Sequence, residues 1–214
     1  MATLDHAVQI LKKQGLEVTL APTTGPATAG KIARDHIKQG AELIVAAGGD
    51  GTINEVVEGM VGSQVPLAIL PGGTANVLAM EMKLGSNLER AAQRLPECRP
   101  HRIPIGRLVS DNGKTGRHFM LMAGIGLDAH IVYNVNASIK ARAGKLAYWV
   151  AGWSLLGRRL VHFQVEVNGR RQECSFALIT KVRNYGGDFE IARNVTIVDD
   201  QFEVVLLEGR STLR

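Results

Sequence analysis

Two short glycine-rich segments contain the residue types best suited to bind an anion. They are GGDGT at residues 48–52 and PGGTAN at residues 71–76. Glycines permit close approach of the backbone, so the peptide N–H groups of such turns can face phosphate oxygens. A bare carboxylate would repel phosphate, so Asp50 is explained chemically if a Mg²⁺ ion lies between the two. The segments therefore predict a site for nucleotide phosphates and a cation.

Each segment lies between a strand pattern and a helix pattern. The buried-type runs AELIVAA and VPLAIL precede the turns, and INEVVEGM and NVLAMEMKL follow them. Ligands of α/β sheets bind beyond the carboxyl ends of the strands, so we expect the two turns side by side. Gly-Asp-Gly alone is also a common turn, but two such turns favour phosphate binding. Thr52 followed by Glu55 predicts a capping box at the start of the helix.

The first hundred residues alternate helix and strand patterns. Further helices are predicted over residues 4–15, 27–40 and 87–95, and a short strand over residues 16–20. This alternation predicts a parallel sheet with helices on both faces, which is an α/β domain over residues 1–102. Such a sheet normally opens on a strand, whereas this sequence opens on a helix. We therefore expect the first strand to be missing.

The second half of the chain, residues 103–214, shows mostly strand patterns. The sequence VEVNGRRQE predicts a hairpin that turns at Asn168 and Gly169. Other strand-like runs cover residues 118–129, 194–200 and 201–209. Together they predict a β-rich domain.

An apolar helix pattern at residues 145–160 stands apart from these strands. Its apolar residues surround most of the helix, which favours a core helix over the alternative of a helix that lies on an acidic membrane surface.

Composition excludes some classes of function. Aromatic residues make up only 5% of the chain, too few for an RNA binder that works by base stacking, and we expect no nucleic-acid partner. The sequence has no apolar run of about 20 residues and no signal-peptide pattern, so we expect no transmembrane segment and a cytoplasmic location. The net charge of +5 suits an anionic partner.

The two glycine segments and their neighbours resemble a known family. GGDGTINEV followed by ILPGGTANVLA is similar to the catalytic domain of the diacylglycerol kinase family, in the bacterial lipid kinase branch related to the sphingosine kinases. Residues 123–132 and 184–202 resemble further stretches of that family. The resemblance implies an α/β domain like that of NAD kinases and phosphofructokinases, followed by a β-sandwich domain. It also implies ATP as a substrate and Mg²⁺ as a cofactor.

The resemblance assigns roles to single residues. Asp50 is implied in catalysis through the cation. Thr24 is the alternative to Thr23 in the nucleotide pocket. For Asn54, Glu55 and Asn76, helix capping and local bonding are the alternative to a contact with the nucleotide. The residues implied at the nucleotide are Thr23, Gly49, Asp50, Gly51, Thr52, Asn54, Glu55, Gly73 and Thr74.

A second cation site is implied near the end of the chain. In the family an aspartate and two backbone carbonyls bind Mg²⁺, and the matching positions are Asp200, Ile197 and Phe202. Oxygen ligands suit such a hard cation. The sequence departs from the family at DDQ, at GGD (residues 186–188) and at Arg193, where the family has proline. A solvated acidic turn is therefore the alternative.

These features predict ATP-dependent transfer of the γ-phosphoryl group to a lipid hydroxyl, diacylglycerol-like, by a cytoplasmic protein peripheral to the membrane. The alternatives are a kinase for a soluble substrate such as NAD and a nucleotide-binding regulatory protein without catalysis. The lipid and the oligomeric state, a homodimer among the options, stay open.

The resemblance also predicts a loss of activity in the chain by itself. The family's first strand and its acidic general base are both expected to lie outside these 214 residues. A general base contributes about 10²- to 10⁴-fold in rate. We expect the chain to bind nucleotide weakly and to show little lipid kinase activity. A side-by-side assay against a chain extended at both ends tests this, and equal specific activity would contradict it.

Overall fold

The computed structural model of the chain consists of two compact units, residues 1–120 and 121–214. The structure describes residues 2–110, 113, 115–126, 161–185 and 189–208. The apolar helix predicted at 145–160 and the GGD segment at 186–188 lie outside the described residues. Residues 103–120 belong to the first unit, although the sequence predicts a domain boundary at residue 102.

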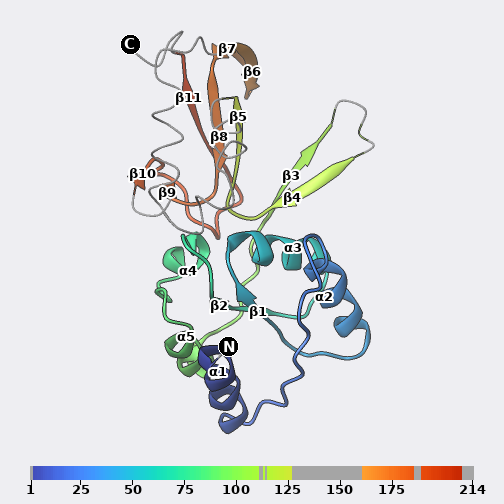
Figure 1. The fold of residues 1–214 in the computed structure, drawn as a ribbon. Helices are drawn as coiled ribbons and strands as arrows, with labels where there is room; N and C mark the ends of the chain where they lie inside the picture. Colours follow the sequence, from blue (N-terminus) through green and yellow to red (C-terminus); the bar gives the residue numbers. More distant parts are fainter. Residues whose placement is uncertain (1, 111–112, 114, 127–160, 186–188, 209–214) are drawn as a thin grey trace. The chain divides into compact units, whose positions relative to one another are not determined.

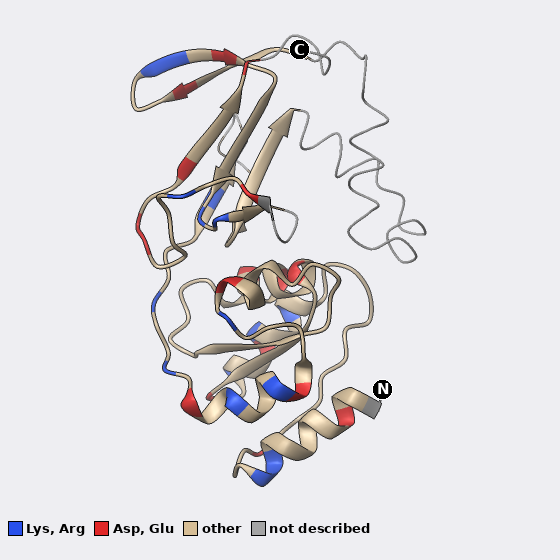
Figure 2. Cartoon of the chain, turned by 90° about the vertical axis from the view of Figure 1, so that its left-hand side faces the viewer, with Lys and Arg blue, Asp and Glu red and all other residues tan. Residues whose placement is uncertain are grey.

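The first unit is built around a parallel strand pair. Strand β1 (Ile44–Gly48) pairs with β2 (Leu67–Pro71), so that Gly48 lies opposite Pro71. Helices lie on both sides of the pair: α1 (Ala2–Lys13) and α5 (Leu88–Arg94) on one, α2 (Ala29–Lys38) and α3 (Asp50–Met60) on the other (Figures 1 and 2). This arrangement confirms the predicted α/β architecture.

The core beneath the strand pair explains one wrong prediction. The buried cluster there consists of Ala7, Leu11, Leu70, Ala91 and Ala92, and Leu16 and Val18 pack against it. Residues 16–20 form no strand, because within the described part of the chain they pair with no neighbouring strand. Their alternation of apolar and polar residues reflects packing on the core.

The first unit also contains a short helix, a 3₁₀ turn and a hairpin. The helix predicted after the second glycine turn is only five residues long, α4 (Val77–Glu81). A 3₁₀ turn, η1 (Leu95–Glu97), follows α5. Strands β3 (Gly106–Val109) and β4 (Gly116–Phe119) then form an antiparallel hairpin.

The second unit is rich in β-strands, as predicted, and its described strands pair antiparallel. Its main sheet has the order β11 (Glu203–Leu207), β8 (Phe176–Thr180) and β5 (Met122–Gly126). The predicted hairpin is confirmed between β6 (Phe163–Val167) and β7 (Arg170–Cys174). Its turn residues Asn168 and Gly169 both have positive φ, at 51° and 78°. The short strands β9 (Asn184–Tyr185) and β10 (Phe189–Glu190) also pair.

Helices α2 and α3 approach each other through two glycines. A Cβ atom added at Gly59 would lie 2.0 Å from the carbonyl oxygen of Gly30, and one added at Gly30 would lie 2.4 Å from the carbonyl oxygen of Glu55. Since both obstacles are backbone atoms, neither can move aside as a side chain would. The distance between the two helices therefore depends on glycine at both positions.

We expect Gly59→Ala to lower the free energy of unfolding by about 2 kcal/mol, because the added methyl group forces the helices apart. The matched control is Gly51→Ala in the same helix, where a Cβ atom meets nothing within 4 Å. That change should be neutral or should stabilise by up to about 1 kcal/mol. Chemical denaturation measures both, and equal stabilities of the two variants would contradict the proposed packing.

Candidate functional site

The two glycine turns lie side by side, as predicted. The N–H of Gly72 donates to the carbonyl oxygen of Gly48 at 2.9 Å. A Cβ atom at Gly73 would lie 2.5 Å from the Cα atom of Gly49, so the two backbones touch without room for a side chain. Because β1 and β2 are parallel, both turns leave the same edge of the strand pair. Their N–H groups can therefore act on one ligand.

Asp50 connects the two turns. It is the first residue of α3, and its Oδ1 atom accepts a hydrogen bond from the backbone N–H of Leu78 at 3.2 Å, in the first turn of α4. Among the described residues no hydrogen bond to the other carboxylate oxygen, Oδ2, is recorded. The hydrogen bond to Oδ1 thus holds the carboxylate against the start of α4.

The predicted capping box is wrong. Helix α3 begins at Asp50 after the N-cap residue Gly49, so Thr52 lies inside its first turn. Glu55 instead accepts hydrogen bonds from the N–H groups of Ala27, at 2.9 Å, and Ala29, at 3.2 Å. These groups lie at the start of α2, whose N-cap residue Thr28 makes no side-chain cap bond. Glu55 therefore caps a neighbouring helix, which agrees with its alternative role.

Asn76 shapes the second turn from within. Its Oδ1 atom accepts from the N–H of Gly73 at 2.8 Å, and its Nδ2 atom donates to the carbonyl oxygen of Gly73 at 2.9 Å. Asn76 has left-handed backbone angles, with φ 49°, and is buried. Since the N–H of Gly73 already has this partner, we assign Gly73 to the close contact between the turns. Thr74 is exposed.

The other predicted residues of the first unit differ in surroundings. Thr23 lies exposed in the extended segment that precedes α2, and Gly51 is exposed at the start of α3. The Nδ2 atom of Asn54 donates to the carbonyl oxygen of His118 at 3.2 Å. Asn54 is thus directed to β4.

A second link between α3 and β4, missed by the sequence, joins Glu58 to His118. The Oε2 atom of Glu58 accepts from the backbone N–H of His118 at 2.8 Å, and Oε1 lies 3.0 Å from its ring Nδ1 atom. Burial alone would raise the pKa of Glu58, but the hydrogen bonds and positive charge of His118, with Arg117, outweigh it and lower the pKa. No local pattern signals a pair 60 residues apart.

The predicted metal ligands Ile197, Asp200 and Phe202 lie in the second unit, in and beside a turn. Residues 194–200, predicted as a strand, form this turn because Asp199 folds back on Thr196. The N–H of Thr196 donates to the Oδ2 atom of Asp199 at 2.6 Å, which lowers the pKa of that carboxyl group. The N–H of Asp199 donates to the carbonyl oxygen of Thr196 at 3.1 Å.

Comparison with known proteins bears on these turns. Residues 2–108, half of the chain, match the family described as the diacylglycerol kinase catalytic domain. The chain belongs to this family. It is 29% identical over 212 residues to the diacylglycerol kinase of Bacillus subtilis (strain 168), which covers 95% of this chain and 68% of that protein.

Two further likenesses agree. A protein of Klebsiella pneumoniae (strain 342) named probable lipid kinase YegS-like is 33% identical over 151 residues, which is 70% of this chain and 49% of that protein. A crystal structure of a diacylglycerol kinase from Bacillus anthracis str. Sterne superposes with a TM-score of 0.73 at 22% identity and covers 97% of this chain and 68% of that one. The superposition shows the same fold. The chain thus spans between about half and two thirds of these proteins.

We expect Glu58→Gln to lower the free energy of unfolding by up to about 1 kcal/mol at pH 7, since the side chain is 38% exposed. The folded-state pKa is lowered, so this contribution is complete above the ordinary value of 4.5 and is lost as the pH falls through the folded value. Urea unfolding from pH 7 to pH 3 measures the difference. A difference in unfolding free energy between the unaltered chain and Glu58→Gln that stays constant or widens below pH 4.5 would contradict the assignment. The control is Glu42→Gln, which changes an exposed carboxylate.

Proposed function

We propose that this chain contains the nucleotide site of an enzyme that transfers the γ-phosphoryl group of ATP to a lipid hydroxyl. The observation that carries the proposal is the junction of the two glycine turns at Asp50. The turns bring the N-terminal ends of α3 and α4 to one edge of the strand pair, where unpaired N–H groups favour an anion. This arrangement suits the phosphates of a nucleotide.

The residues at the junction would have different roles, some at the phosphates and one at the cation. The backbone N–H groups of Gly51 and Thr52 lie in the first turn of α3, where no intrahelical acceptor exists for them, and would bind phosphate oxygens. Asp50 would hold a Mg²⁺ ion through Oδ2, because a carboxylate oxygen suits this cation and because without it the carboxylate would repel phosphate. The ion, when bound, would neutralise charge on the transferred phosphoryl group.

The proposal that the acceptor is a lipid is based on the names of the relatives. Diacylglycerol kinases and a lipid kinase, by their names, stand among the matching proteins. The particular lipid is not specified by the residues of the turns, because pockets for acyl chains consist of interchangeable apolar side chains. We propose a diacylglycerol-like lipid at the membrane surface. Within the described residues, no helix combines the length and apolar character needed to cross a bilayer.

We expect Asp50→Asn to reduce phosphoryl transfer at least about 100-fold, because an NH₂ group, which cannot bind a cation, takes the place of Oδ2 when Oδ1 still accepts from Leu78. Asparagine keeps an Oδ1 atom that can accept from Leu78, so the fold should persist, whereas Asp50→Ala loses this bond as well. Transfer is measured with labelled ATP and lipid vesicles, in the chain extended at both ends, and Mg·ATP binding to the present chain by calorimetry.

The control is Asp35→Asn, which removes an exposed carboxylate paired with Lys31 on α2. It should leave nucleotide binding and transfer unchanged. Normal transfer by Asp50→Asn would refute the role of Asp50. Label in NAD rather than in the organic phase would favour a kinase for a soluble substrate, and nucleotide binding without any transfer would favour a regulatory protein.

A further inference from the structure

Lys181 is a buried lysine that the proposed phosphoryl transfer does not use. It directly follows β8, the central strand of the main sheet in the second unit, and its side chain is 1% exposed. Its backbone N–H donates to the carbonyl oxygen of Leu121 at 2.8 Å, which continues the pairing of β8 with β5. A buried ammonium group is costly unless it finds oxygen partners.

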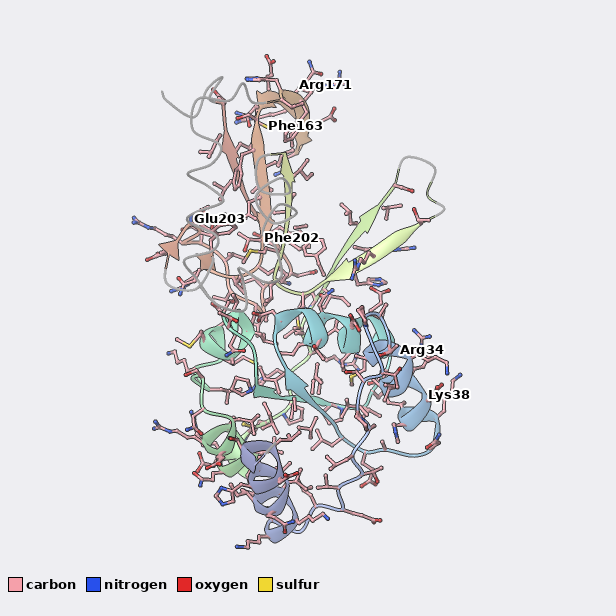
Figure 3. All side chains as sticks on the ribbon, in the orientation of Figure 1. Arg34, Lys38, Phe163, Arg171, Phe202 and Glu203 are labelled. Atoms are coloured by element: carbon pink, nitrogen blue, oxygen red, sulfur yellow. The ribbon has the colours of Figure 1, made fainter. Side chains whose placement is uncertain are left out.

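Those partners belong to the turn that contains the predicted metal ligands. The Nζ atom of Lys181 donates to the carbonyl oxygen of Asp199 at 2.5 Å. It also lies 5.7 Å from the ring centroid of Phe202, within the range of a cation–π contact. Phe202 directly precedes β11 and is labelled beside Glu203 in Figure 3. The ammonium group is thus in contact with both ends of the segment 199–202.

Two carboxylates of the turn, Asp199 and Asp200, lie near the Lys181 ammonium group, and Arg183 is a second positive charge near Asp199. Burial lowers the pKa of the Lys181 ammonium group, and the neighbouring carboxylates of Asp200 and Asp199 act against this shift, because they favour the charged form. Asp199 at the same time binds the N–H of Thr196. Glu203, at the start of β11, binds the N–H groups of Arg193, at 3.1 Å, and Asn194, at 2.8 Å, so it is engaged in fixing the other end of the turn.

A divalent ion fits this turn poorly. An ion bound by Asp200 and by the carbonyl oxygens of Ile197 and Phe202 would share the segment with the Lys181 ammonium group, which interacts with the Asp200 carboxylate, and two neighbouring cations repel each other. Mg²⁺ also demands nearly octahedral oxygen coordination.

We propose that the Lys181 ammonium group is the cation that orders the turn of residues 196–202, and that this turn binds no divalent metal ion. A lysine attached to the central strand is present at constant occupancy, so the order of the turn does not depend on the concentration of free metal. The proposal concerns only the second unit and is independent of the Mg²⁺ ion proposed at Asp50.

Hydrogen exchange of the full chain, followed by mass spectrometry, tests the proposal without ATP or lipid. The peptides that cover residues 192–203 contain the bonded N–H groups of Thr196 and Asp199. In the unaltered chain their exchange should be the same in EDTA and in millimolar Mg²⁺. An exchange that Mg²⁺ slows on the order of tenfold in these peptides would overturn the proposal.

Two variants test the lysine itself. Lys181→Met keeps a long side chain but removes the charge, and should speed exchange of the same peptides on the order of tenfold. Lys31→Met, which removes an exposed lysine in the first unit, should leave them unchanged. Unchanged exchange in Lys181→Met would also overturn the proposal. If that variant does not fold, the comparison of Mg²⁺ with EDTA on the unaltered chain still decides.

Discussion

The first unit depends on the direct contact of two backbones at Gly49 and Gly73. A side chain at Gly73 would collide with the Cα atom of Gly49, so this approach is available to glycine alone unless the turns separate. The parallel pairing of β1 and β2 brings the turns to one edge, and the glycines let them meet there. Asp50, which follows Gly49 directly, accepts from the N–H of Leu78 across this contact. The proposed phosphate site is therefore a consequence of strand direction and glycine together.

In both units, carboxylates accept hydrogen bonds from backbone N–H groups of neighbouring elements. Asp50 serves the start of α4, Glu55 the start of α2, and Glu203 the entrance to the turn before β11. Neither α2 nor α4 receives a cap bond from the side chain of its own N-cap residue. N–H groups at a helix start need acceptors, and here a carboxylate of another element supplies one. For Asp50 this bond uses Oδ1, and Oδ2 is the atom proposed to hold the cation.

The sequence predicted those features that depend on local pattern. The two glycine turns, the helices around them and the hairpin at Asn168 and Gly169 follow from turn chemistry and periodicity. The strand at residues 16–20 was predicted wrongly because alternation reports burial and cannot supply a pairing partner. The capping box placed Glu55 at the start of its own helix, whereas it accepts from N–H groups at the start of α2, because this role depends on how α2 packs on α3. The contacts of Lys181 likewise arise from tertiary structure, and no spacing in the sequence indicates them.

The two units differ in how they would balance negative charge. At Asp50 the carboxylate lies beside a proposed site for phosphates, and a cation that arrives with the nucleotide would neutralise a charge that is itself transient. At Asp199 and Asp200 the negative charge is permanent, and a permanent cation from the chain, Lys181, lies among these residues. A tethered ammonium group is desolvated once, during folding, whereas an exchangeable ion must be bound anew from solution. Charge balance by lysine therefore suits a turn with a structural role, and charge balance by Mg²⁺ suits a site where the anion comes and goes.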